Sequence, residues 1–234
     1  MQFENNLSAI RALQNDFTVV GTSIFADFPE TFNCFEVLSA FQLPKLLFPN
    51  ATDPERVKRF CINSSLVFLA VKTHILTMDL TYSETEKKLE MAVLNGDLLS
   101  GRFAKRMIID DELDLLKEWL DRLLPFYSDL TDMSLAGVDK SERMLYCSSK
   151  LLTNQIEIGA THPSFGGTPQ VVRTHVDDLA EGLVNKNWDN LLTAVSSDER
   201  LLVAAQNLIH SQKQYAKLPL NRFCISTLEA EKTI

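Results

Sequence analysis

Glycine and proline are scarce in this sequence, with 8 of each among 234 residues. Average usage would give roughly 12% for the two together, so turns and loops must be few. This scarcity argues against a sandwich or barrel of many short strands, which needs frequent turn residues. Leucine, a strong helix former, is the most frequent residue. We therefore expect an all-α protein, organised as one helical domain over residues 1–234.

The sequence also lacks an excess of positive charge. Lys and Arg total 23 against 31 Asp and Glu, which gives a net charge of −8 and a pI near 5.1. Binding to a nucleic-acid backbone needs a clustered positive field, so we expect no nucleic-acid partner. The four cysteines form no CxxC pair and no Cys/His spacing typical of a metal site. They are interpreted as ordinary buried thiols.

Long apolar runs are absent as well. The longest one, Leu66 to Val71, is far shorter than the ~20 residues of a membrane-spanning helix. The first residues, MQFENNLSAIRALQNDF, have no basic stretch followed by an apolar one, as a signal peptide would. These features predict a cytoplasmic protein without a transmembrane segment.

Apolar spacing and helix-start residues predict a series of helices. A first helix is indicated by apolar residues that recur every three or four positions from Phe3 to Phe17. Asp53 and Pro54 form a helix start, and the helix that follows to about Leu80 is apolar on nearly every side, as in the interior of a bundle. Residues 159–169 are the clearest loop. Other helices are expected within 18–50 and over 83–108, 110–124 (ended or kinked by Pro125), 140–158, 170–184, 188–195 and 198–216.

Two glycines, Gly96 and Gly101, lie in the middle of an expected helix. Each costs about 1 kcal/mol relative to alanine, which suggests that something passes close to the backbone at these positions. Gly96, Ser100 and Ala104 form a stripe of small residues at intervals of four. Such a stripe would permit close helix packing or leave an open lumen beside the helix.

Two acidic clusters are candidate metal sites. Asp110, Asp111 and Asp114 match DDxxD, the pattern with which class I prenyltransferases hold Mg²⁺ against a diphosphate. A weaker cluster of the same kind begins 67 positions later and contains Asp177, Asp178 and Glu181. For the first cluster we favour a simpler interpretation, in which acids in the first turn of an amphipathic helix interact favourably with its dipole.

Other catalytic signatures are absent. His74, His162, His175 and His210 show no HExxH spacing, and no serine lies in a GxSxG turn. The sequence also has no GxGxxG motif and no Walker loop. Zinc, nucleophilic and nucleotide-dependent chemistry are therefore not expected.

Two neighbouring segments carry a family resemblance. Residues 70–80, AVKTHILTMDL, and residues 88–107, KLEMAVLNGDLLSGRFAKRM, resemble the trans-polyprenyl diphosphate synthases. They are most similar to the small regulatory subunit of the heterodimeric heptaprenyl and hexaprenyl diphosphate synthases of menaquinone side-chain synthesis. Leu94 to Gly101 match the family's signature of leucine, a small residue, Gly-Asp, two apolar residues and serine. The first aspartate-rich motif is missing, because residues 73–79 contain one carboxylate, Asp79, where a metal cluster needs two or three.

The resemblance, which covers about forty residues, implies an isoprenoid-synthase-like helical bundle that does not catalyse the reaction itself. Such a subunit is inactive alone, requires a catalytic large subunit that holds Mg²⁺, and helps to set the length of the polyprenyl diphosphate product. This chain would then contain no catalytic residue and no metal ligand. The residues expected near the product tunnel or the subunit contact are Leu69, Thr73, Leu76, Gly96, Asp97, Ser100, Gly101 and Ala104.

Alternatives remain open at this point. The small-residue positions can equally serve tight helix packing alone. The chain can also be a stand-alone Mg²⁺-dependent terpene or prenyl synthase that uses the two acidic clusters as its metal clamp. A third possibility is a helical adaptor whose apolar face binds an unrelated protein.

Overall fold

The computed structural model describes Ser39, Phe48 and residues 51–79, 86–166, 174 and 176–215, and every regular element in these ranges is helical. The prediction of an all-α protein is therefore confirmed for this part of the chain. Almost all of the helices expected within 3–17 and 18–50, and the helix start at Ser83, lie outside the described residues. The described elements are α4 (Pro54–Asp79), α5 (Glu86–Ile109), α6 (Leu113–Leu135), α7 (Lys140–Thr161), the 3₁₀ helix η1 (Pro163–Phe165), α9 (Val176–Val184), α10 (Trp188–Ala194) and α11 (Glu199–Tyr215).

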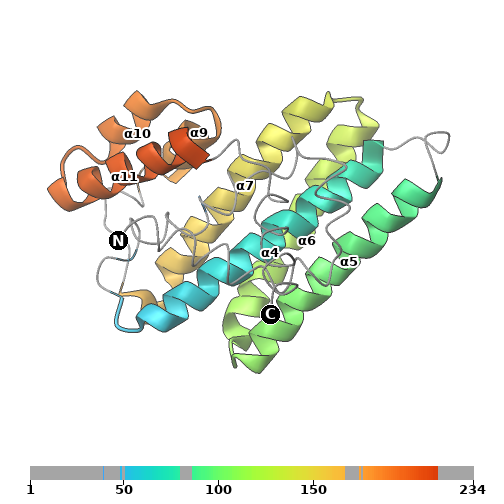
Figure 1. Cartoon of the computed structure of the whole chain (residues 1–234), viewed down its shortest axis with the longest axis horizontal. Coiled ribbons are helices and arrows are strands. Elements are labelled where there is room, and N and C mark those ends of the chain that lie inside the picture. Colours follow the sequence, from blue (N-terminus) through green and yellow to red (C-terminus); the bar gives the residue numbers. More distant parts are fainter. Residues whose placement is uncertain are drawn as a thin grey trace, which may run out of the picture.

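The long helices α4 to α7 form a bundle with α4 at its centre (Figure 1). α4 packs against α5 on one side and α7 on the other, whereas α6 packs against α7 and α5. The three short helices form a second group beside α7, in which α9 contacts α7 and α10 contacts both α9 and α11. The loop expected after α7 thus separates two groups of helices.

α4 begins as the sequence predicts. The Asp53 carboxylate accepts a hydrogen bond from the backbone N–H of Arg56 (2.9 Å), and Pro54 occupies the first turn. Every residue from Phe60 to Thr73 is buried, which agrees with a helix that is apolar on nearly every side. By length and composition, the part of α4 from Pro54 to Met78 is apolar enough to cross a membrane, but 89% of its most apolar window is buried inside the bundle.

α6 differs from the expected helix at both ends. It begins at Leu113 after a turn over residues 110–112, and it continues past Pro125 to Leu135, so of the two predicted effects of this proline, an end or a kink, the end is wrong. Pro125 lies on the exposed side of the helix. Proline has no backbone N–H, so one hydrogen bond of the helix is missing at Pro125. The packing of the buried face before and after the proline stabilises the helix despite this loss. That face consists of Leu115, Trp119, Leu123, Phe126 and Leu130.

α7 starts at Lys140 as expected, with the Asp139 carboxylate accepting from the N–H of Ser141 (2.7 Å). It extends to Thr161, three residues beyond the predicted end, so Gly159 belongs to the helix and not to the loop. The ring of Phe48 packs directly onto Gly159, where any Cβ atom would overlap with it. The chain turns only after η1, at Gly166, whose φ is 75°.

The two cysteines in the described part of the chain fit the predicted role. Cys61 and Cys147 are both buried in the bundle interior. Cys34 and Cys224 lie outside the described residues.

Candidate functional site

The Gly-Asp signature lies on α5 where this helix packs against His74 of α4. The α-carbon of Gly96 faces the ring of His74, and a Cβ atom at position 96 would lie 2.7 Å from His74 Cε1 and 2.9 Å from Nδ1. The absence of a side chain at Gly96 thus allows an imidazole to lie against the α5 backbone. The expectation that something passes close to the backbone is confirmed at Gly96.

His74 is held in a largely apolar junction between three helices. Its ring lies edge-on to Tyr127 of α6, with 6.1 Å between ring centroids, and its Nε2 atom is 3.9 Å from the carboxylate of Asp97 on α5. Burial lowers the pKa of His74, and the Asp97 charge opposes this shift without cancelling it. Burial also raises the pKa of Tyr127. At neutral pH both rings are therefore uncharged.

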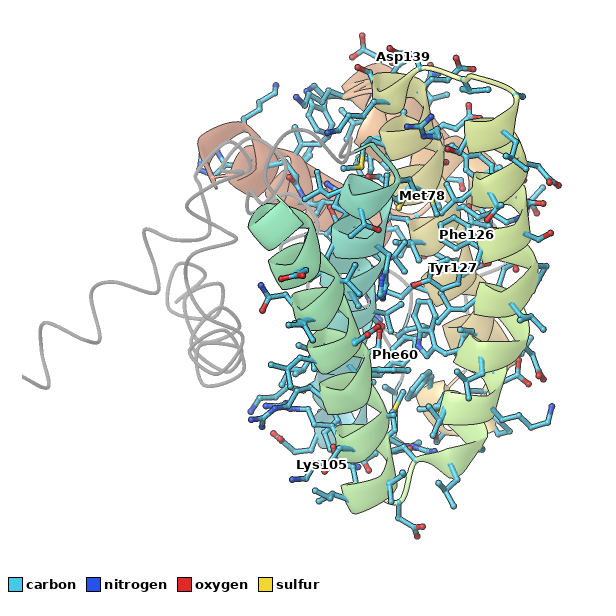
Figure 2. All side chains as sticks on the ribbon, turned by 90° about the vertical axis from the view of Figure 1, so that its right-hand side faces the viewer. Phe60, Met78, Lys105, Phe126, Tyr127 and Asp139 are labelled. Atoms are coloured by element: carbon cyan, nitrogen blue, oxygen red, sulfur yellow. The ribbon has the colours of Figure 1, made fainter. Side chains whose placement is uncertain are left out.

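An apolar cleft of about 620 Å³ opens directly beside this junction. It lies between α4, α5 and α6, and Tyr127 belongs to both the cleft and the His74 contact. Figure 2 shows Phe60, Phe126 and Tyr127 lying between the helices of the bundle. The volume falls within the roughly 300–1,000 Å³ typical of small-molecule sites. The lining residues are Val67, Ala70, Val71, Ser100, Phe103, Ala104, Leu120, Asp121, Leu123, Leu124 and Tyr127.

The residues expected near a tunnel or subunit contact fall into four groups. Ser100 and Ala104 line the cleft, and Gly96 and Asp97 form the junction with His74. Leu69, Thr73 and Leu76 are fully buried in α4, and the Thr73 hydroxyl donates to the carbonyl of Leu69 (2.8 Å). These three residues serve the core. Gly101 is exposed, and no described atom of this chain lies within 4 Å of a Cβ built there.

The first acidic cluster forms the turn between α5 and α6. Asp111 adopts a φ of 57°, in the left-handed region, and is exposed, as is Asp114 at the start of α6. The Asp114 carboxylate accepts hydrogen bonds from Arg56 (3.1 Å) and from His162 Nε2 (2.5 Å). Desolvation acts to raise the pKa of Asp114, but these hydrogen bonds outweigh it and hold the pKa below its ordinary value. Asp114 thus belongs to an ion-pair network.

The centre of that network is Glu112, a residue that the sequence analysis did not single out. Its carboxylate is almost fully buried and accepts from Arg56 Nε (2.6 Å) and Arg59 Nη2 (3.1 Å), both on the first turns of α4. A buried carboxylate between two guanidinium groups is compensated in charge and in hydrogen bonding. No local spacing marks this pairing, because 56 positions separate Arg56 from Glu112.

Ser164, His162 and Asp114 form a chain of hydrogen bonds that belongs to the same network. The Ser164 hydroxyl lies 2.8 Å from His162 Nδ1, and His162 Nε2 lies 2.5 Å from Asp114. The Ser164 oxygen also accepts from Arg56 Nη1 (2.7 Å). Since Arg56 holds both the serine and the aspartate, the chain of contacts ties the start of α4, the α5–α6 turn and the end of α7 together. We interpret these contacts as structural, because they hold the three segments together.

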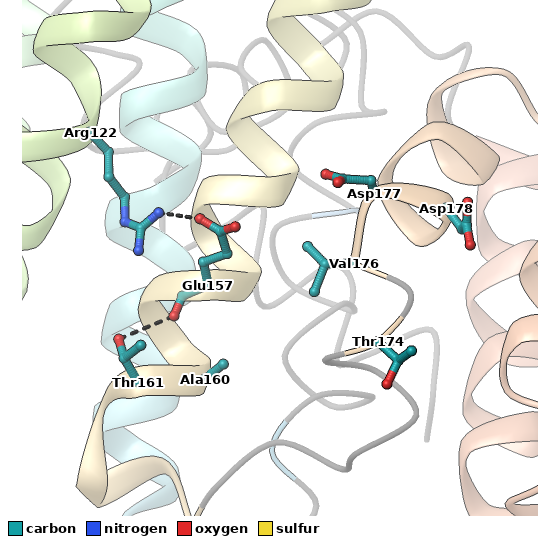
Figure 3. Close-up of a pocket in the computed structure, with 8 residues that line it drawn as sticks. All are labelled: Arg122, Glu157, Ala160, Thr161, Thr174, Val176, Asp177 and Asp178. Carbon is teal, nitrogen blue, oxygen red and sulfur yellow. Dashed lines mark hydrogen bonds and ion pairs between the residues drawn. The ribbon is translucent and has the colours of Figure 1, made fainter.

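The second acidic cluster borders a polar cleft of about 590 Å³ beside α7 (Figure 3). Arg122 of α6 and Glu157 of α7 form an ion pair across this cleft. Asp177, at the start of α9, is directed toward α7 and accepts a hydrogen bond from Thr153 (3.3 Å), whereas Asp178 is directed away from α7. Glu181 is exposed on the next turn of α9. The three acids therefore do not converge on one point.

The two acidic clusters also lie far apart in the fold. The α5–α6 turn is at one end of the bundle, and α9 lies on the opposite side of the molecule (Figure 1). Among the residues that the structure describes, no group of three or more His, Cys, Asp or Glu side chains is placed to hold a metal ion. His175 lies outside those residues, and His210 is exposed on α11.

Comparisons with protein families, with curated proteins and with solved structures find no match to this chain.

Proposed function

We propose that this chain is a non-catalytic subunit of a heterodimeric polyprenyl diphosphate synthase, and that its apolar cleft receives part of the growing polyprenyl chain. The fold proposed is an isoprenoid-synthase-like bundle. The catalytic large subunit would hold Mg²⁺ and join isopentenyl diphosphate to an allylic diphosphate. The observation that carries the proposal is the apolar cleft of about 620 Å³ beside the Gly-Asp signature.

The composition of α4 at the junction supports a non-catalytic role. Where the resemblance places the first aspartate-rich motif, α4 contains Thr73, whose hydroxyl is used within the helix, and His74, whose pKa is lowered by burial. Neither side chain is an anionic ligand of the kind that Mg²⁺ prefers. The Asp97 carboxylate, 3.9 Å from His74 Nε2, is mostly exposed on α5.

The cleft itself is suited to a linear apolar chain. Its lining is aliphatic and aromatic except for Ser100 and Asp121, and Leu120 and Leu124 at its edge are 53% and 78% exposed. A bound hydrocarbon would cover these two leucines. Burial of one five-carbon unit is worth about 3 to 4 kcal/mol at ~0.8 kcal/mol per methylene. A few such units would therefore give a cleft of this kind a substantial influence on product length.

The proposal is tested by activity in reconstituted mixtures. The purified chain, a candidate catalytic subunit and their mixture are each incubated with an allylic diphosphate, isopentenyl diphosphate and Mg²⁺, and the products are analysed by chain length. We expect long products from the mixture only. Product formation by this chain alone would support the stand-alone synthase instead, and an unchanged product pattern in the mixture would refute the subunit assignment.

A matched pair of variants tests the cleft. Ser100→Trp places an indole in the cleft and should shorten the product while the complex still assembles. Ser197→Trp adds the same side chain at an exposed site between α10 and α11 and should leave the product length unchanged. Equal product spectra from the two variants in assembled complexes would show that the cleft does not receive the chain.

A further inference from the structure

The outer face of α5 is apolar although it faces solvent. Its five large hydrophobic residues are between 38% and 69% exposed, and Gly101 lies at their centre with open space above it. At 3.6 residues per turn, all of them lie within about 80° of the direction of Gly101, so they form a single face. Large apolar residues gathered on one exposed helix face are typical of an interaction site. The five residues are Val93, Leu94, Leu98, Ile108 and Ile109.

The residues on either side of Gly101 are arranged so that this face could pair with the same face of a second copy. Asp97 lies four positions before Gly101 and Lys105 four positions after it, and both side chains are exposed. Leu94 and Ile108 lie seven positions before and after it in the same way. In an antiparallel pair of α5 helices related by a twofold axis at Gly101, each Asp97 would therefore face a Lys105 of the second copy, and each Leu94 would face an Ile108.

Gly101 also fits the position of a twofold axis. A glycine in the middle of a helix weakens the helix, and no described atom of this chain approaches Gly101 closely enough to require it. At a helix crossing, the absence of a side chain allows two backbones to approach. The lysine side of the face is visible in Figure 2, where Lys105 extends away from the bundle.

We propose that a second copy of this chain packs on the outer face of α5, antiparallel and with Gly101 on the twofold axis. Such an interface is isologous, because the same patch serves both partners. Its two symmetric Asp97–Lys105 pairs fix the antiparallel register. The proposal is independent of the polyprenyl synthase assignment, since it rests on the exposed face of α5 and not on the cleft.

The expected interface is small. α5 has 24 residues and is about 36 Å long at 1.5 Å per residue. A strip of that length and a helix's width gives on the order of 400 Å² per copy, about half of the ~800 Å² per partner of a standard interface. We therefore expect a dimer that forms reversibly in the micromolar concentration range.

Charge reversal tests the register. Sedimentation equilibrium of the full chain over a range of concentrations should show a monomer and dimer in exchange. Asp97→Lys and Lys105→Asp should each weaken the dimer at least tenfold, and the double variant with both changes should restore it, because opposite charges then face each other again. Lys150→Asp, on the exposed side of α7, should leave the dimer unchanged. Far-UV circular dichroism verifies that all variants are folded.

Cross-linking tests the axis. Under mild oxidation, Gly101→Cys should yield a disulfide-linked dimer far faster than Leu145→Cys, which places a thiol on the exposed side of α7. A wild-type chain that stays monomeric at all concentrations would overturn the proposal. So would single charge reversals without effect, or a double variant that fails to recover. If the α5 face is protected only when a catalytic subunit is added, the second-copy proposal fails while the proposed function stands.

Discussion

Gly96 and Gly101 lie five residues apart on α5, and the structure predicts opposite effects for the same substitution at the two positions. Gly101→Ala meets open space, so the variant should gain the helix propensity of alanine, about 1 kcal/mol. Gly96→Ala gains the same propensity but places its methyl group 2.7 to 3.0 Å from three ring atoms of His74. The balance at Gly96 therefore depends on whether the imidazole can move.

The packing of His74 indicates that its movement is costly. The ring is confined between the α5 backbone and Tyr127, and its side chain is only 23% exposed. Overpacking of a filled site costs about 1 to 3 kcal/mol, and loss of the aromatic contact costs about 0.5 to 1.5 kcal/mol more. We expect Gly96→Ala to destabilise the fold by about 1 to 3 kcal/mol net of the propensity gain. The two alanine variants should then differ by about 2 to 4 kcal/mol.

Urea unfolding followed by far-UV circular dichroism measures this difference, at a protein concentration low enough to keep the chain monomeric. The variant His74→Ala supplies the control, because in its background the methyl group of Gly96→Ala meets no ring. The double variant should therefore show the stabilisation expected of alanine in a helix, relative to His74→Ala alone. If Gly96→Ala stabilises the wild-type chain as much as Gly101→Ala does, the close contact with His74 has no energetic weight and the reasoning fails.

Other expected effects follow from the ion-pair network, the junction and the cleft. Glu112→Gln should cost about 3 to 5 kcal/mol in unfolding free energy, because it leaves two guanidinium groups without their buried partner, whereas Asp114→Asn at a half-exposed site should cost about 1 kcal/mol or less; equal costs would contradict the central role of Glu112. The lowered pKa of His74 means that below pH 6.5 the unfolded chain binds more protons at this residue than the folded chain does, so the free energy of unfolding should decrease as the pH is lowered through this range. His74→Gln should reduce this dependence of the unfolding free energy on pH, as measured by urea unfolding at a series of pH values. Leu124→Ser should weaken the binding of an apolar fluorescent probe to the cleft without lowering the melting temperature, since Leu124 is mostly exposed, and a loss of stability in place of binding would assign it to the core.

Features encoded by neighbouring residues could be predicted from the sequence. Asp53 and Pro54 mark the start of α4 because a cap and a first-turn proline act within one turn. The start of α7 at Lys140 and the all-helical class follow from similarly local or compositional signals. The burial of α4 is predictable too, since its apolar residues cover nearly every side of the helix.

Features that depend on residues distant in sequence were not predictable. The role of Glu112 requires Arg56 and Arg59, which reach it only because the α5–α6 turn folds back beside the start of α4. Within the apparent DDxxD motif, the residue at the centre of the ion-pair network is thus one of the two that the motif leaves unspecified. The continuation of α6 past Pro125 was not predictable for a related reason, because the buried face of α6 on both sides of the proline outweighs the local preference for a break.

The two glycines of α5 show that residue type alone does not predict what surrounds a position on a helix. A stripe at intervals of four places Gly96, Ser100 and Ala104 along one side of the helix, toward α4 and the cleft, and this part of the prediction could be made from spacing alone. Gly101 follows Ser100 by one residue and is therefore rotated by about 100°, which turns it from the cleft to the outer face. Gly96 thus makes room for His74 of its own chain, whereas no described atom of that chain lies close to Gly101. In the proposed antiparallel dimer, the α5 helix of a second copy packs over Gly101, and the self-complementary charges of Asp97 and Lys105 on either side of it support that assignment.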